Sequence, residues 1–220
     1  MTDTTTSSGN NPGVMRKQHN LTVRTSLPRY LPPQEVVNAL QTYIPVIKHQ
    51  ALVTRYERAM GIPHCARDPF FHGGSPIANP AVDDNPPVSY RNGALVAFNV
   101  FERINLIPGI ASKEITFPAT FQNVPGGVRC RADAPGGVTL WTEFKVRPKP
   151  RNLNAPSSAA GSAWDWEAEV DRRREYELVE WVTVEASSLL MPFVARSMEG
   201  AHKDICQKVI DEVAVRWSWE

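Results

Sequence analysis

The chain has 220 residues, of which 42% are hydrophobic and 21% charged, and its formal net charge is +1 at neutral pH. This length suits one large domain, and so small a net charge excludes a broad electrostatic attraction to nucleic acid or to anionic lipid. Cys65, Cys130 and Cys206 lie far apart with no C-x-x-C pair. We therefore predict no disulfide framework and a reducing, cytoplasmic compartment.

The start of the chain is rich in Thr, Ser, Asn and Gly, and residues 1–18 are predicted to be a disordered tail. It lacks the apolar centre of a signal peptide, and no later run is long enough to span a bilayer. We therefore expect no stable membrane insertion, and a single domain over residues 19–220.

The first part of this domain reads as strand, helix, strand. His19 to Leu27 alternates apolar and polar residues, which is typical of a half-buried strand. Pro33 opens a helix with an apolar side that continues to Ile47, because proline is tolerated in the first helical turn. Ala51 to Ala59 alternates again and is predicted to be the second strand.

A segment without periodicity follows, over residues 61–92. It is rich in proline and carries two adjacent phenylalanines, Phe70 and Phe71. Loops this long are uncommon in compact domains and often act as lids or binding loops. We expect a lid whose two phenylalanines close a pocket.

From Ala94 to Arg147 the sequence alternates in four runs, separated by proline–glycine turns at 108–109, 125–127 and 135–137. Short turns imply antiparallel neighbours, and Pro118 inside the second run indicates an edge or a bulge. A second long loop over residues 148–174 precedes the last predicted strand, Tyr176 to Ala186.

The C-terminal end, from Leu189 to about Trp217, is predicted to be one long amphipathic helix. It is too amphipathic to cross a membrane, so its apolar stripe must lie on the sheet. We predict an α+β fold in which a curved antiparallel sheet of about six to seven strands wraps this helix. The predicted stripe is Leu190, Val194, Met198, Ala201, Ile205, Val209 and Val213.

This order of elements resembles the helix-grip architecture of the START and Bet v 1-like superfamily, except that those folds usually have two short helices or one broken helix near the start. Over residues 19–216 the chain is also similar to a family of uncharacterised fungal proteins with a domain of unknown function. Three motifs carry that similarity: Leu27-Pro28-Arg29-Tyr30-Leu31-Pro32, Ala134-Pro135-Gly136-Gly137 and Leu189-Leu190-Met191-Pro192-Phe193-Val194. The resemblance implies a cavity between sheet and helix, and it supplies no catalytic residues.

Such a cavity would be mostly apolar and suited to a small hydrophobic molecule. The alternative is that the inward side chains simply fill the core. The expected ligand contacts are Phe71, Phe98, Val100, Phe117, Phe121, Leu140, Phe144, Phe193 and Met198.

Three polar residues, Glu102, Thr142 and Glu180, fall in phase with the apolar faces of their strands. An inward carboxylate is costly unless it is paired or faces a wet cavity, and its raised pKa suits general acid or base work. These three are the candidate catalytic residues. The alternative is that each reaches solvent at a strand end or pairs with Arg103 or Arg55.

Metal-ligand residue types gather at His64, Cys65, Asp68 and His72. They match no standard zinc spacing, so we predict no metal site and no cofactor. His202, at the flank of the helix stripe, is expected to be a satisfied residue at the edge of the core.

Three functions stay open. The first is a cofactor-independent cyclase or isomerase, in which the cavity folds a hydrophobic secondary-metabolite intermediate for a reaction such as an intramolecular cycloaddition. The second is a carrier of a lipid, a sterol or a similar hydrophobic ligand. The third is an interaction domain with a filled core. The sequence favours a ligand cavity and slightly favours the enzyme, and it makes no prediction of oligomeric state.

Overall fold

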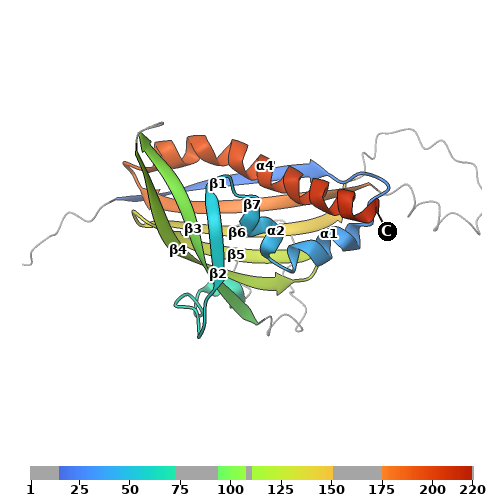
Figure 1. The fold of residues 1–220 in the computed structure, drawn as a ribbon, viewed down its shortest axis with the longest axis horizontal. Helices are drawn as coiled ribbons and strands as arrows, with labels where there is room; N and C mark the ends of the chain where they lie inside the picture. The colour runs from blue at the N-terminus through green and yellow to red at the C-terminus, as the bar shows by residue number, and fades with distance from the viewer. Residues whose placement is uncertain (1–14, 73–93, 108–110, 151–174, 220) are drawn as a thin grey trace, which may run out of the picture.

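The computed structural model describes residues 15–72, 94–107, 111–150 and 175–219. Within these ranges, seven antiparallel strands form one sheet in the order β1-β7-β6-β5-β4-β3-β2, and a long helix lies across it (Figure 1). The strands are β1 (Arg16–Ser26), β2 (Val53–Arg58), β3 (Leu95–Ile107), β4 (Ala111–Val124), β5 (Gly127–Ala134), β6 (Val138–Pro148) and β7 (Tyr176–Ser187). The helices are α1 (Pro33–Leu40), α2 (Ile44–Lys48), the 3-10 turn η1 (Pro69–His72) and α4 (Met191–Trp217).

The predicted fold class is confirmed: a curved seven-stranded antiparallel sheet and a long C-terminal helix make an α+β helix-grip fold. Strands β2 to β7 pair with their sequence neighbours, and β1 pairs with β7. None of the described helices combines the length and the apolar character that crossing a membrane requires.

Two predicted boundaries differ from the structure. The first strand begins at Arg16, so residues 16–18 belong to the sheet and not to a tail. The predicted helix from Pro33 to Ile47 is two helices, with Tyr43 between them at a φ of 69°. Pro45 has no N–H to donate, so a continuous helix through this point would lose a backbone hydrogen bond. The two short helices are the arrangement that the helix-grip resemblance implied.

Pro118 lies at a local edge of the sheet, as predicted. It pairs with Asn99 of β3, while the pairing of β4 with β5 begins only at the next residue, Ala119. Here β4 therefore has a single neighbour, and a residue without an N–H costs no hydrogen bond on the open side.

Parts of four predicted segments lie outside the described residues. They are residues 1–14 of the tail, residues 73–92 of the first long loop, the turn at 108–109, and residues 151–174 of the second long loop. The turn before β5 is described, and it requires glycine at Gly127. A Cβ atom at this position would overlap the carbonyl oxygen of Phe144 on the paired strand β6.

The sheet has an inner face toward α4 and an outer face away from it. The second half of α4 packs tightly on the inner face and on α1 and α2. Its buried residues are His202, Ile205, Cys206, Val209, Ile210, Val213 and Ala214. The predicted stripe residues Met198, Ile205, Val209 and Val213 are buried, whereas Ala201, which we also placed in the stripe, is exposed. The stripe is wider than predicted, because His202, Cys206 and Ile210 are buried as well.

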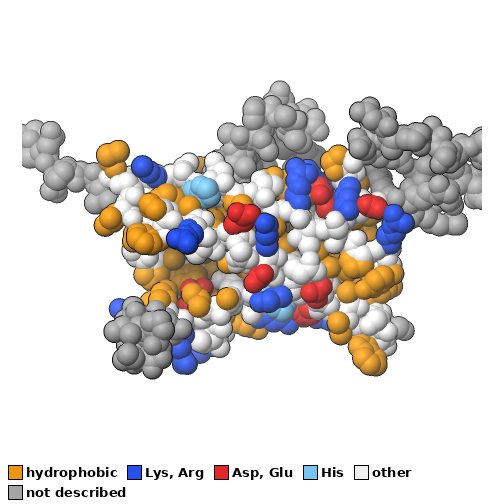
Figure 2. Space-filling view, turned by 90° about the horizontal axis from the view of Figure 1, so that it is seen from above, with side chains coloured by type: hydrophobic (Ala, Val, Ile, Leu, Met, Phe, Trp, Pro, Cys, Tyr) orange, Lys and Arg blue, Asp and Glu red, His pale blue; other side chains and the backbone are white. Residues whose placement is uncertain are grey.

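The first half of α4, taken as Met191 to Ala201, is packed more loosely, because only Met191 and Met198 are buried there. The inner face beneath and beside it is partly uncovered, with half-buried side chains at Ile104, Ile115, Ala132 and Leu140. In Figure 2, hydrophobic side chains surround a hollow on the face of the molecule that is seen there.

Candidate functional site

A buried polar group joins β7 to α4. Glu180 faces α4 from the middle of β7 and is completely buried, with 0% of its surface exposed. One carboxylate oxygen lies 2.5 Å from Nδ1 of His202, and the other accepts a hydrogen bond of 3.3 Å from Sγ of Cys206. His202 and Cys206 are one helical turn apart, so a single carboxylate binds both.

This arrangement orients the imidazole of His202. A carboxylate hydrogen-bonded to Nδ1 fixes the orientation of the ring and leaves Nε2 as the atom that can contact another group. Nε2 has no hydrogen-bond partner within the described ranges. Glu180 therefore contacts His202 in the interior and does not reach solvent at a strand end, which was one alternative open from the sequence.

The cysteines in this interior stay as thiols. Burial and the charge of Glu180 raise the pKa of the Cys206 thiol far above its usual range, so Cys206 acts as a hydrogen-bond donor and not as a nucleophile. Burial likewise raises the pKa of Cys130 on β5. Thr142 is 3% exposed and pairs with Cys130 across the two strands. It therefore faces the interior, as the sequence predicts.

Glu102 is the second inward carboxylate. It lies on β3 opposite Ile115 of β4, and burial raises its pKa above the usual value of a glutamate. Among the described residues it has no ion pair, because Arg55 binds Glu57 and Glu114 instead. Glu102 is half-buried, so its carboxylate keeps contact with water while it lies beside apolar side chains.

The predicted ligand residues fall into three groups. Phe98, Val100, Phe117, Phe121 and Phe144 are buried in the main core, where Phe98 and Phe121 pack edge to face with their ring centroids 5.8 Å apart. These side chains largely fill the part of the interior that lies beneath the second half of α4. Met198 is buried in a second cluster with Val182 and Val184, and half-buried Leu140 packs against it beneath the first half of α4.

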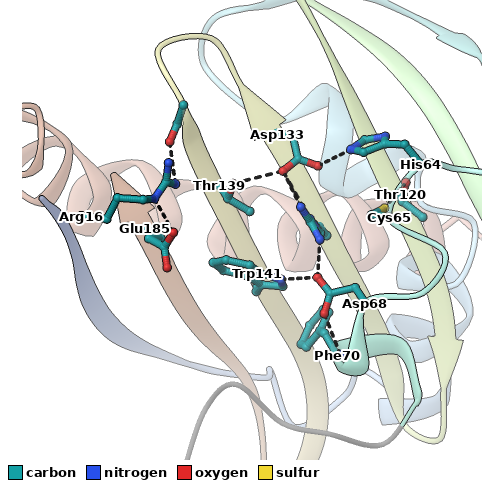
Figure 3. Close-up of polar contacts among 12 residues, drawn as sticks. Arg16, His64, Cys65, Asp68, Phe70, Thr120, Asp133, Thr139, Trp141 and Glu185 are labelled. Carbon is teal, nitrogen blue, oxygen red and sulfur yellow. Dashed lines mark hydrogen bonds and ion pairs between the residues drawn. The ribbon is translucent and has the colours of Figure 1, made fainter. Parts of the chain in front are cut away.

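Phe193 and Phe71 do not line the interior. Phe193 is 73% exposed, because it lies on the side of α4 that faces away from the sheet. Phe71 packs with Phe70 and Cys65 against Leu95 and Trp141 on the outer face. In Figure 3 the segment that carries Phe70 lies on one side of the sheet and α4 passes on the other.

A polar network holds this segment to the outer face, so its described part is not the lid that we predicted. The carboxylate of Asp68 accepts hydrogen bonds from Nε1 of Trp141 at 2.8 Å and from the backbone N–H of Phe70 at 2.9 Å, and it forms an ion pair with Arg131 (Figure 3). Burial alone would raise the pKa of Asp68, but these three donors outweigh it and lower the pKa. Arg129 also donates to the backbone carbonyl of Phe70 at 2.9 Å.

A small cleft of about 130 Å³ lies between α1 and the end of α4. It is lined by Glu35, Asn38, Ala39, Thr42, Val213, Arg216 and Trp217, and it contains none of the predicted site residues. Its volume is below the roughly 300 Å³ at which small-molecule pockets begin.

Comparisons with known proteins give the family. A family model described as a domain of unknown function, DUF7053, matches residues 16–215. The chain belongs to the DUF7053 family. No curated protein matches this DUF7053 chain in a sequence search.

A solved structure shares the fold of this DUF7053 domain, and a second one shows weaker similarity. TTHA0849 from Thermus thermophilus is 12% identical, with a TM-score of 0.50, over 90% of this chain and 99% of that chain. Ara h 8.0201 is 10% identical, with a TM-score of 0.43, over 89% of this chain and 99% of that chain. Similarity at this level concerns the fold alone.

Sequence reasoning missed the partners of Glu180 in this DUF7053 domain. His202 and Cys206 follow Met198 at steps of four, which puts all three on one face of α4. That spacing predicts a polar pair inside the apolar stripe. It does not predict which strand residue the pair contacts.

Proposed function

We propose that the protein binds a small hydrophobic molecule in the interior between the first half of α4 and the β3–β4 wall. We further propose that it isomerises or cyclises this molecule without a cofactor, with a hydrophobic secondary-metabolite intermediate as the substrate class. The observation that carries the proposal is Glu102, a partly buried carboxylate beside apolar side chains, which forms no ion pair with any residue that the structure describes.

Glu102 is suited to proton transfer near neutral pH. Its raised pKa brings the carboxyl group closer to the pH at which it can both accept and return a proton. Removing a proton from one carbon of the bound molecule and returning it to another leaves the oxidation state unchanged, so the reaction needs no redox partner. Ring closure within a folded substrate needs even less, namely a shaped cavity and one hydrogen bond.

His202 is the second polar group that we assign to this site. Glu180 holds its Nδ1, so Nε2 is presented in a fixed orientation. In this role His202 polarises a carbonyl of the substrate or takes its proton, and Glu180 acts through His202. Thr142 is retained as a hydrogen-bond donor on the same face, where its hydroxyl orients a polar group of the substrate.

The second candidate is a carrier that binds a lipid or sterol and leaves it unchanged. The half-buried apolar residues of the inner face, Ile104, Ile115, Ala132 and Leu140, favour hydrophobic binding equally in both cases. The two functions differ only in whether the polar groups move a proton.

The experiment begins with native mass spectrometry of freshly purified, tag-free protein, followed by organic extraction of any bound compound. The extracted compound is returned to fresh protein in D₂O. An isomerase incorporates deuterium or changes the structure of the compound, whereas a carrier releases it unchanged.

Glu102→Gln should abolish this exchange and leave binding in place. Glu114→Gln is the matched control, because Glu114 is an exposed glutamate on the paired strand of the same hairpin. Exchange that persists in Glu102→Gln contradicts the assigned role of Glu102. If the wild type and the control both bind the compound and show no exchange, the carrier function is favoured. A protein that binds no hydrophobic compound contradicts both functions.

A further inference from the structure

Three metal-ligating side chains meet on the outer face of the sheet, on the opposite face from the residues of the proposed function. His64 and Cys65 precede η1, and Asp133 lies near the end of β5. One ligating atom from each lies within 4.8 Å of the other two. We propose that His64, Cys65 and Asp133 form a binding site for one zinc-type divalent ion, and this proposal does not depend on the function of the interior.

The distances fit a site that closes around an ion after movements of about 1 Å, in which atoms up to 4.8 Å apart approach and the closest pair separates. Nε2 of His64 lies 2.9 Å from Oδ2 of Asp133 (Figure 3). Tetrahedral zinc ligands at the usual bond lengths are separated by about 3.3–3.7 Å. The two atoms must therefore separate by less than about 1 Å, and the His64 side chain, which is 57% exposed, has room to move.

The other two ligands are held in place by neighbouring groups. Oδ1 of Asp133 accepts hydrogen bonds from Arg131 at 2.9 Å and from Thr139 at 3.1 Å, which leaves Oδ2 directed at the site. Cys65 is 4% exposed, and its Sγ lies 3.2 Å from Oγ1 of Thr120. Such outer contacts orient ligands and are a usual part of metal sites.

The local charge also fits a cation, although Arg131 lies beside the site. Arg131 forms ion pairs with both Asp68 and Asp133, so one positive charge faces two negative charges. Ionisation of Cys65 adds a third negative charge, and the net charge of −2 matches a divalent ion. Metal binding by Cys65 releases the thiol proton, because the thiolate is the ligand.

The donor set identifies the kind of metal. Imidazole, thiolate and carboxylate together suit Zn²⁺ or Co²⁺, whereas Ca²⁺ and Mg²⁺ prefer oxygen ligands alone. The other two ligand types noted from the sequence are engaged elsewhere: Asp68 binds Trp141 and Arg131, and Nε2 of His72 lies 2.7 Å from the carbonyl of Ala66. Three protein ligands leave the fourth position of a tetrahedral ion open to water or to a small ligand.

Titration of the tag-free full chain with Co²⁺, and competition by Zn²⁺, tests the site directly. We expect one equivalent to bind with a thiolate-to-cobalt charge-transfer band. Cys65→Ser should lose that band, and His64→Ala should weaken binding about tenfold or more. His72→Ala is the matched control in the same segment and should bind as the wild type does.

His64 is exposed, so His64→Ala leaves the fold intact even if Cys65→Ser does not fold. The proposal is overturned if the wild type gives no charge-transfer band. It is equally overturned if His64→Ala binds as tightly as the wild type, or if His72→Ala loses binding to the same extent as His64→Ala.

Discussion

Replacing Glu180 with alanine tests the buried link between β7 and α4. The carboxylate is 0% exposed, and it binds Nδ1 of His202 and Sγ of Cys206. Removing it leaves two polar groups buried without their partner, and breaking such a buried pair costs about 3–5 kcal/mol. Glu180→Gln keeps the shape and one acceptor oxygen, so we expect the smaller loss of about 1–3 kcal/mol that is typical of one buried hydrogen bond.

The assay is urea-induced unfolding followed by circular dichroism, with the free energy of unfolding extrapolated to water. A double-mutant cycle with His202→Ala should give a coupling energy of about 1 kcal/mol or more between the two side chains. Glu199→Gln is the control, because Glu199 lies exposed on the same helix in an ion pair with Lys203, and it should unfold as the wild type does. An alanine variant within about 0.5 kcal/mol of the wild type, or an additive cycle, would refute the reasoning.

Three further predictions concern other parts of the fold. Burial raises the pKa of Glu102, so the ionised carboxylate destabilises the folded protein. This destabilisation is absent in acid and grows as the pH rises through the pKa of the folded state. Glu102→Gln should therefore be more stable than the wild type at pH 7 and equally stable near pH 3, whereas the control Glu114→Gln should show no such gain. The pKa of Asp68 is lowered, so Asp68→Asn should lose stability above about pH 4 and converge with the wild type in stronger acid, and equal curves at neutral pH would contradict the network on the outer face. Gly127→Ala should destabilise by about 3 kcal/mol or more, because the new Cβ overlaps backbone, whereas Gly200→Ala in α4, with nothing within 4 Å, should gain about 0.5–1 kcal/mol in thermal or urea unfolding.

The strands and the long helix could be predicted because the spacing of apolar residues within each segment indicates which side of it is buried. Alternation placed Phe98, Phe117 and Phe144 on the inner face, and the structure has them there. The helical period leaves positions at the flank of a stripe ambiguous, since an alanine such as Ala201 suits either environment. That ambiguity is why the buried position was assigned to Ala201 and not to His202.

Contacts between distant residues could not be predicted in this way. His202 lies 22 residues from Glu180, and Asp133 lies 69 residues from His64. The segment around Phe71 has no periodicity, so its sequence carries no information about which face of the sheet it covers. The segment lies on the outer face because Trp141 and the arginines of β5 donate hydrogen bonds to it there.

The most direct test of the proposed function is the binding of a hydrophobic fluorescent probe, anilinonaphthalene sulfonate, to wild-type protein and to a variant with a blocked interior. Ala132→Trp places a large side chain on the half-buried inner face of β5, and Thr116→Trp places the same side chain on the exposed outer face of β4. We predict saturable binding at one site per chain in the wild type and in Thr116→Trp, and its loss in a folded Ala132→Trp. Equal binding by Ala132→Trp and the wild type would contradict the account.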